Sequence, residues 1–152
     1  MKCKKVYMAS DHAGFEAKNE VIRILKELGV DVVDLGPNSS EVSVDYPKYA
    51  KKVCNKVLKD ENNFGILICG SGTGMQIAAN KIRGIRAAFS YDEYSAKMAR
   101  YDNDANVLTL RGREFDFRRY SEIVSAFLNT DFSGEKRHKK RIDELSKLES
   151  EK

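Results

Sequence analysis

Short apolar runs alternate along the chain with longer segments in which apolar residues recur every three or four positions. A short apolar run bounded by turn-forming residues is typical of a strand that is covered on both faces. The runs that predict strands cover residues 6–9, 30–35, 66–68, 85–89 and 107–110.

The segments between these runs have the period of amphipathic helices, and capping residues mark their ends. The predicted helices lie between Gly14 and Gly29, after Pro47, after Gly74, from the cap Asp92 through Met98, over residues 115–128, and from about Arg137 onward. Because strands and helices alternate throughout, we predict an α/β fold. It is a single three-layer α/β/α, Rossmann-like domain over residues 1–152, with a five-stranded parallel sheet and a C-terminal helix.

The strand over residues 66–68 leads into the most informative stretch of the chain, Cys69 followed by Gly70, Gly72 and Gly74. A turn between a parallel strand and a helix is where α/β sheets bind ligands, and the amides at a helix start favour anions. A thiol in that place is expected to have a pKa lowered from about 8.5 toward neutrality. The loop therefore offers a nucleophile or base beside anion-binding amides, although a cysteine that ends a buried strand is often only a small core residue.

Several other kinds of site are excluded by spacing. The glycines follow neither the dinucleotide pattern GxGxxG nor the phosphate-loop pattern that ends in Gly-Lys-Ser/Thr. The chain has two histidines and no Cys-x-x-Cys pair, which argues against a metal site. We therefore predict no metal and no cofactor.

The amino-acid composition narrows the class of protein further. Of the 152 residues, 33% are charged and 41% hydrophobic, as in soluble globular proteins. No apolar run approaches the roughly 20 residues of a membrane span, and three cysteines without close pairing favour a reducing compartment, the cytoplasm. The net charge of +4 is concentrated near residues 136–141. Such a run is a solvated helix face or a phosphate contact, and without a nucleic-acid motif we expect no nucleic-acid partner.

Six motifs in this order together resemble one family. They are Ser10-Asp-His-Ala-Gly14, Val44-Asp-Tyr-Pro47, Cys69-Gly-Ser-Gly-Thr-Gly74, Gly84-Ile-Arg-Ala-Ala88, Asn103-Asp-Ala-Asn-Val-Leu108, and Arg137-His138 with Arg141. Over nearly its whole length the chain resembles the type B ribose 5-phosphate isomerases, which belong to the ribose/galactose isomerases. The resemblance implies a cofactor-free aldose–ketose isomerase of the pentose phosphate pathway. It acts on a phosphorylated sugar, as a homodimer or tetramer with active sites shared between subunits.

The resemblance also implies a role for each matching residue. Cys69 is the base that moves a proton between carbon-1 and carbon-2, Ser71 shuttles protons between the sugar oxygens, and the amides from Gly70 through Gly72 to Gly74 hold the enediolate. Asp11 and Tyr46 contact the sugar. His12, Arg137 and Arg141 match positions near the phosphate. Asn103 and Arg113 match positions supplied by the neighbouring subunit.

Simpler roles stay open for these residues. They are a helix cap for Asp11, a structural donor for His12, a packed ring for Tyr46, a turn former for Asn103, and a surface charge for Arg113 and Arg141. Asp102 stands where the family usually has the histidine assigned to opening the sugar ring. This exchange leaves two alternatives open. The first is another sugar phosphate, such as erythrose 4-phosphate, allose 6-phosphate or galactose 6-phosphate, and the second is a sugar-phosphate-binding subunit without turnover.

Overall fold

A parallel five-stranded sheet forms the centre of the computed structural model, which describes residues 3 and 5–151; the remaining residues of the predicted 1–152 domain lie outside this description. The strands are β1 (Lys5–Ser10), β2 (Val32–Asp34), β3 (Asn63–Cys69), β4 (Ala87–Phe89) and β5 (Val107–Arg111). They lie in the order β2-β1-β3-β5-β4, and all neighbours pair in parallel. The predicted five-stranded parallel sheet is confirmed.

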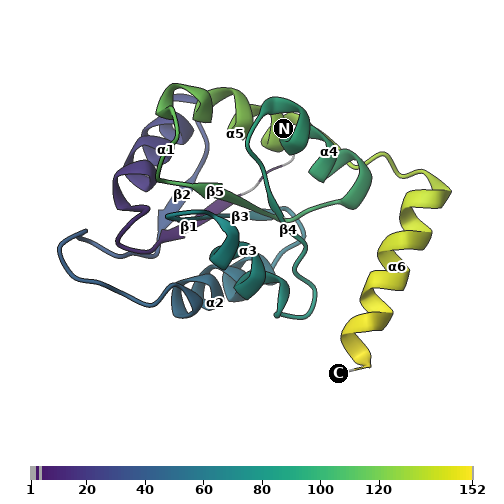
Figure 1. Cartoon of the computed structure of the whole chain (residues 1–152). Coiled ribbons are helices and arrows are strands. Elements are labelled where there is room, and N and C mark those ends of the chain that lie inside the picture. Colours follow the sequence, from purple (N-terminus) through teal and green to yellow (C-terminus); the bar gives the residue numbers. More distant parts are fainter. Residues whose placement is uncertain (1–2, 4, 152) are drawn as a thin grey trace.

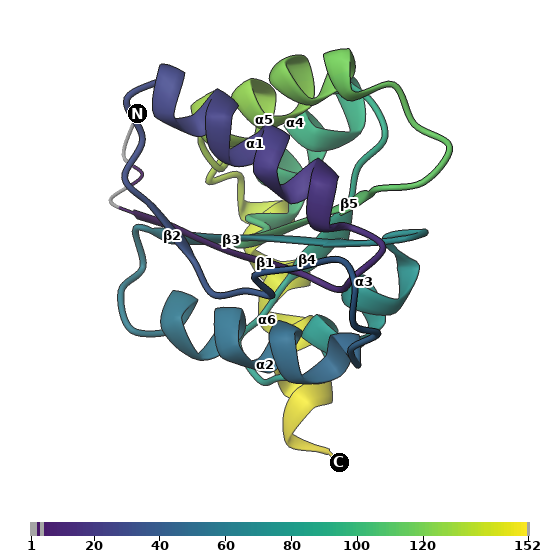
Figure 2. The same ribbon diagram turned by 90° about the vertical axis from the view of Figure 1, so that its left-hand side faces the viewer.

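Helices cover both faces of the sheet (Figures 1 and 2). One face carries α1 (Phe15–Glu27), α4 (Glu93–Asn103) and α5 (Tyr120–Asn129), and the other carries α2 (Tyr46–Val57) and α3 (Thr73–Asn80). The last helix, α6 (Lys136–Ser150), stands beside the layers rather than within them (Figure 1). The three-layer Rossmann-like architecture is therefore confirmed. In the described part of the chain, no helix is long and apolar enough to cross a membrane.

The central strand β3 shows why the apolar runs are continuous. All of its residues are buried, because helices pack on both faces of the sheet. Ile66 and Ile68 point into the core under α1, α4 and α5, whereas Leu67 and Cys69 point into the core over α2 and α3. Alternate residues of one strand thus complete two separate cores.

The order of the strands fixes where a ligand site is expected. The chain leaves β1 through α1 toward β2 on one side, and later returns through α2 to β3 on the other side of β1. In open α/β sheets, ligands bind at the carboxyl ends of the strands where the winding direction changes. That point lies between the ends of β1 and β3, where the chain carries Asp11 and Cys69.

Two strands are shorter than the sequence pattern predicted. β2 begins at Val32 rather than at residue 30, because the amide of Val30 donates to the carbonyl of Leu25 at the end of α1, at 2.9 Å. β4 begins at Ala87 rather than at residue 85, because the amide of Arg86 donates to the Asn106 side chain, at 2.9 Å. In both places the amide bonds a group outside the strand ladder, with Val30 bonding the end of the preceding helix and Arg86 bonding a side chain from a distant part of the sequence.

Two helix boundaries also differ from the prediction. The cap at Asp92 is confirmed, since its carboxylate accepts from the Ser95 amide at 2.7 Å. The helix that follows does not stop at Met98, however, and continues to Asn103, where Asp104 adopts the left-handed conformation with φ 45°. The helix predicted over residues 115–128 instead begins with the short 3-10 helix η1 (Phe117–Arg119) and continues as α5.

Candidate active site

Cys69 ends β3 and leads into the glycine-rich loop before α3. The cysteine is 4% exposed, and the left-handed φ of Gly72, +80°, turns the chain into the helix. A Cβ atom at Gly72 would lie 2.6 Å from the ring of Phe89, so a larger residue does not fit there. Ser71 is exposed, and its hydroxyl accepts from the Thr73 amide at 3.3 Å. The predicted succession of strand, turn and helix is confirmed.

The loops after β1 and β5 hold this cysteine loop by backbone hydrogen bonds. The amide of Asp11 donates to the carbonyl of Ile68 at 3.1 Å. From the other side, the amides of Gly112 and Arg113 donate to the carbonyls of Cys69 and Gly70 at 2.9 and 3.1 Å. The loops after strands one, three and five thus share the carboxyl edge of the sheet, as predicted.

Asp11 and His12 organise the turn after β1. The Asp11 carboxylate is buried and accepts from the Gly14 amide at 2.9 Å, just before α1 begins. Nδ1 of His12 accepts from the amide of Val44 at 3.2 Å. A ring nitrogen that accepts carries no proton, so His12 presents an Nε2–H donor. Asp11 therefore bonds the amide of the N-cap residue Gly14 rather than capping the helix itself, and His12 is a structural acceptor rather than the structural donor left open above.

Tyr46 and Arg113 lie against the glycines of the cysteine loop. A Cβ atom at Gly74 would lie 2.8 Å from Cζ of Tyr46, and one at Gly70 would lie 3.3 Å from Nη1 of Arg113. Both side chains are open to solvent. Arg113 therefore reaches the loop of its own chain.

These residues form the first of two groups, here called the cysteine-loop cluster: Cys69, Ser71, the loop glycines Gly70, Gly72 and Gly74, Asp11, His12, Tyr46 and Arg113. The cluster brings together a thiol, a hydroxyl, an imidazole N–H, helix-start amides and a guanidinium. That combination suits the removal of a proton from carbon next to a carbonyl and the stabilisation of the resulting oxyanion. Within residues 3 and 5–151, no group of three or more His, Cys, Asp or Glu side chains is arranged to hold a metal ion.

The other two cysteines differ from Cys69 in their surroundings. Cys54 is completely buried on α2, as predicted, and burial raises the pKa of its thiol from 9.0 to about 12. Partial burial likewise raises the pKa of Cys3 to about 11. All three thiols are free, and Cys69 is the cysteine that lies beside the helix-start amides.

The remaining candidate residues form a second group, here called the helix-end cluster: Asp102, Asn103, Arg137, His138 and Arg141. Asp102 and Asn103 lie in the last turn of α4 rather than in a loop, and the others lie on α6. Nε2 of His138 lies 3.5 Å from Oδ1 of Asp102. Arg137 donates to Glu135 at 2.7 Å, a hydrogen bond that lowers the pKa of Glu135, and Arg141 is exposed.

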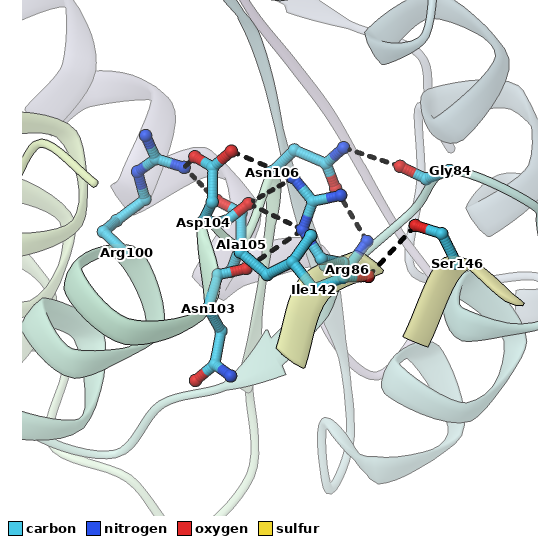
Figure 3. A network of polar contacts seen from close by, with 9 residues as sticks. All are labelled: Gly84, Arg86, Arg100, Asn103, Asp104, Ala105, Asn106, Ile142 and Ser146. Carbon is cyan, nitrogen blue, oxygen red and sulfur yellow. Dashed lines mark hydrogen bonds and ion pairs between the residues drawn. The ribbon is translucent and has the colours of Figure 1, made fainter. Parts of the chain in front are cut away.

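A network of hydrogen bonds fixes the end of α4 (Figure 3). Nε of Arg86 donates to the carbonyls of Asn103 and Asp104, both at 3.0 Å. Arg100 donates to the Asp104 carboxylate at 2.8 Å and to the carbonyl of Ala105 at 2.6 Å. The side-chain amide of Asn103 points away from these bonds (Figure 3). The network therefore positions the backbone of this turn and leaves that amide available to a ligand or a partner.

The two clusters lie at opposite edges of the sheet. Asp102 and Asn103 of the helix-end cluster precede β5, and the carbonyl of Asn106 accepts from the amide of Gly65, near the start of β3, at 2.9 Å. Cys69 lies at the other end of β3, four residues farther on. At about 3.3 Å per residue of strand, the backbone at Gly65 and Asn106 lies roughly 13 Å from the backbone at Cys69. One chain therefore does not bring all the candidate residues to one point.

A groove of about 480 Å³ runs along the edge strand β4 between α3 and α6. Its lining includes Phe89, which packs on Gly72, and Asn103 at the other end. On its α6 side lie Leu145 and Leu148, which are 45% and 56% exposed. The predicted amphipathic helix is present, but nothing in the described chain covers this part of its apolar face.

Some residues of these clusters gave no signal in the sequence. The last motif includes His138 but indicates no role for it, and its burial follows from the packing of α6 on α4. No role was predicted for Arg86 and Arg100, yet their guanidinium groups hold the end of α4. Charged residues that bond backbone carbonyls look the same in a sequence as solvated ones.

The chain is similar to known proteins over nearly its whole length. Residues 6–145 match the family model described as Ribose/Galactose Isomerase. The ribose-5-phosphate isomerase B of Escherichia coli is 42% identical over 96% of this chain and 97% of its own length. The crystal structure of a ribose 5-phosphate isomerase from Thermotoga maritima has a TM-score of 0.90 and 48% identity, covering 94% of this chain and 97% of that one. The type B ribose 5-phosphate isomerase of Trypanosoma brucei has a TM-score of 0.91 and 44% identity, covering 96% and 99%.

Proposed function

The chain belongs to the ribose/galactose isomerase family, and from this membership we propose that it interconverts ribose 5-phosphate and ribulose 5-phosphate. The reaction passes through an enediolate, with Cys69 as the base. It is a step of the pentose phosphate pathway in the cytoplasm and needs no cofactor. The names of the similar proteins from Escherichia coli, Thermotoga maritima and Trypanosoma brucei support this substrate.

The position of Cys69 is the observation that carries the proposal. Enediolate formation needs a base near carbon-2 and donors aimed at the oxygen on which negative charge develops. Cys69 lies at the end of the central strand, and the amides that begin α3 follow it directly. Three backbone hydrogen bonds from neighbouring loops keep this loop in place, so the donors need little rearrangement during the reaction.

The proposed steps use the residues of the cysteine-loop cluster. The Cys69 thiolate takes the hydrogen of carbon-2 as a proton and returns it to carbon-1. In the same conversion, the oxygen on carbon-2 loses a proton and the oxygen on carbon-1 gains one, and the exposed hydroxyl of Ser71 carries out this transfer. The loop amides and the guanidinium of Arg113 stabilise the charge of the enediolate, and Asp11, His12 and Tyr46 orient the sugar.

We further propose that the complete site forms between two copies of the chain, in a homodimer or tetramer. The helix-end cluster lies at the opposite end of the strands from Cys69, too far away to serve the Cys69 of its own chain. A second copy would supply Asn103 and Asp102 together with Arg137 and Arg141, which are four residues apart on α6 and share one face. The uncovered groove along β4 and the exposed Leu145 and Leu148 support such an association.

One observation favours a second substrate. Ring opening takes a proton from the anomeric hydroxyl and gives one to the ring oxygen, a pair of transfers suited to a neutral imidazole. Asp102 occupies the position expected for that group. Erythrose 4-phosphate cannot close a five-membered ring, because its terminal oxygen carries the phosphate, and it would need no such group. Erythrose 4-phosphate is therefore the alternative substrate.

The test is a turnover assay of the purified full chain on a panel of sugars: ribose 5-phosphate, erythrose 4-phosphate, allose 6-phosphate, galactose 6-phosphate and unphosphorylated ribose. We expect the highest kcat/KM on ribose 5-phosphate and no measurable turnover of ribose. The absence of turnover on any pentose phosphate would refute the leading proposal. Turnover of erythrose 4-phosphate alone would establish the alternative, and binding without turnover would identify a non-catalytic subunit.

A further inference from the structure

His138 is buried at the start of α6, where it faces the end of α4. The side chain is 4% exposed and lies between the rings of Tyr101 and Phe132, with centroid distances of 6.1 and 6.5 Å. The segment before α6 is attached to α4 as well, because the amide of Ser133 donates to the carbonyl of Tyr101 at 3.0 Å. The imidazole is therefore held in one place and one orientation.

Ser133 contacts one ring nitrogen of His138, and the roles of donor and acceptor in this contact depend on the tautomer of the imidazole. Oγ of Ser133 lies 2.6 Å from Nδ1 of His138 and also accepts from the amide of Glu135 at 3.2 Å. Because Oγ already accepts from the Glu135 amide, we assign the single proton of this hydroxyl to Nδ1. Nδ1 then accepts, so the proton of the neutral ring is on Nε2.

Nε2 of His138 faces the carboxylate of Asp102. It lies 3.5 Å from Oδ1, and the Asp102 side chain is 43% exposed. One side of the carboxylate thus lies close to Nε2, at a separation longer than an ordinary hydrogen bond, while the carboxylate remains accessible from solvent. Arg137 adds a positive charge in the same region, since Asp102 is among the charges that raise the pKa of Arg137.

We propose that His138 is a positioning residue for Asp102, and that Asp102 opens the sugar ring in a shared active site. This inference rests on the proposed function. Nε2–H of His138 holds Oδ1, so that Oδ2 accepts the proton of the anomeric hydroxyl. As that O–H bond breaks, the bond from carbon-1 to the ring oxygen also breaks, and its electron pair goes to the ring oxygen, which takes a proton from water. The products are the open aldehyde, hydroxide and protonated Asp102, and the proton of Asp102 then returns to the hydroxide, which restores water and the carboxylate.

The experiment compares two amides that resemble different nitrogens of the imidazole. The amide of His138→Gln reaches the place of Nε2 and keeps a donor for Asp102, whereas the shorter His138→Asn reaches only the place of Nδ1. Asp102→Asn removes the base itself. Isomerisation of ribose 5-phosphate is measured against enzyme concentration, and spontaneous ring opening of the sugar is measured separately.

We expect the rates of the native protein and of His138→Gln to rise in proportion to enzyme concentration, past the rate of spontaneous opening. His138→Asn should lose roughly ten- to a hundredfold in kcat, as when an orienting partner is removed. The rates of His138→Asn and Asp102→Asn should reach a plateau at the rate of spontaneous opening, because these variants use only the open sugar. A purely structural defect lowers the slope of the rate against enzyme concentration but produces no plateau at the rate of spontaneous opening.

Clear results would overturn the inference. Turnover of the sugar by Asp102→Asn at a rate above that of spontaneous ring opening would overturn it. Equal rates for His138→Gln and His138→Asn would also overturn it. Nitrogen NMR of the native chain gives a test that does not depend on the folding of any variant, because the chain has only two histidines. Finding the proton of His138 on Nδ1 would refute the positioning role. If the native chain turns over no pentose phosphate, the proposed function itself fails. An active native chain whose His138 and Asp102 variants keep native rates is a different result, which refutes only this inference.

Discussion

The cysteine-loop cluster is held in place mainly by contacts of the backbone, whereas the helix-end cluster is held mainly by contacts of side chains. Around Cys69 the contacts are made by backbone amides and by glycines against which Tyr46, Phe89 and Arg113 pack. At the end of α4 and on α6 they are made by polar side chains, such as Arg86, Arg100 and His138. A backbone-built site places donors accurately with little freedom, which suits the reacting carbons. Exposed cations on a helix suit the recognition of a phosphate some distance away.

The largest effect is expected from the backbone-built region. Cys69→Ala should leave the fold intact and lower kcat by at least roughly 10²-fold, as when a catalytic base is lost. The control is Cys54→Ala, which removes a buried thiol of the same chain and should change stability rather than turnover. Near-native turnover by correctly folded Cys69→Ala would show that this cluster does not perform the chemistry.

The second prediction tests whether the two regions serve each other across subunits. Cys69→Ala and the double variant Arg137→Leu/Arg141→Leu, each inactive alone, are mixed after dissociation. With random pairing in dimers, about half of the dimers are hybrids, and each has one site with both clusters intact, so about a quarter of native activity should return. Cys69→Ala mixed with Arg113→Leu should recover nothing, because both changes lie in the cysteine-loop cluster. Recovery in the second mixture alone would reverse our assignment of Arg113.

The third prediction concerns the helix-end cluster alone. Arg141→Leu should raise KM for the phosphorylated sugar with a smaller change in kcat. The loss should correspond to about 2–5 kcal/mol if phosphate is held by buried charge pairs in the assembled site. Lys140→Leu is the matched control, since Lys140 is the preceding residue of α6 and lies 4.0 Å from Glu144. Equal increases in KM for both variants would indicate a general effect of charge rather than a binding site.

The smallest expected effect is a dependence of stability on pH that comes from the buried thiol of Cys54. The thiol of Cys54 has a pKa of about 12 in the fold and 9.0 as a free group, so above about pH 9 the unfolded chain loses a proton that the folded chain keeps. Stability should therefore be undiminished below pH 9 and fall above it by up to about 1.4 kcal/mol per pH unit from this group. Denaturant titrations between pH 8 and about 11 should show a shallower fall in Cys54→Ala than in the native chain. Cys3 and Tyr120, whose pKa values are also raised, are present in both proteins and do not affect the difference.

The sequence predicted the sheet and the cysteine loop because both depend on local patterns. The apolar run that ends at Cys69 and the glycines that follow it specify a buried strand and a tight turn without reference to the rest of the chain. The end of α4 was missed because Asp104 adopts a left-handed conformation and is held not only by Arg100 of the same helix but also by Arg86, which lies elsewhere in the sequence. Similarly, only the three-dimensional packing pairs His138 with Asp102.

The close approach of Gly14 to β3 limits how this loop can be transferred to another protein. A Cβ atom at Gly14 would lie 2.7 Å from the carbonyl oxygen of Ile68, the same oxygen that accepts from the Asp11 amide. On the other side, the loop depends on Gly112, where a Cβ atom would lie 3.0 Å from the carbonyl oxygen of Ala13. An engineer who grafts residues 69–74 onto another α/β scaffold must move residues 10–14 and 110–113 with them, as one inseparable cassette.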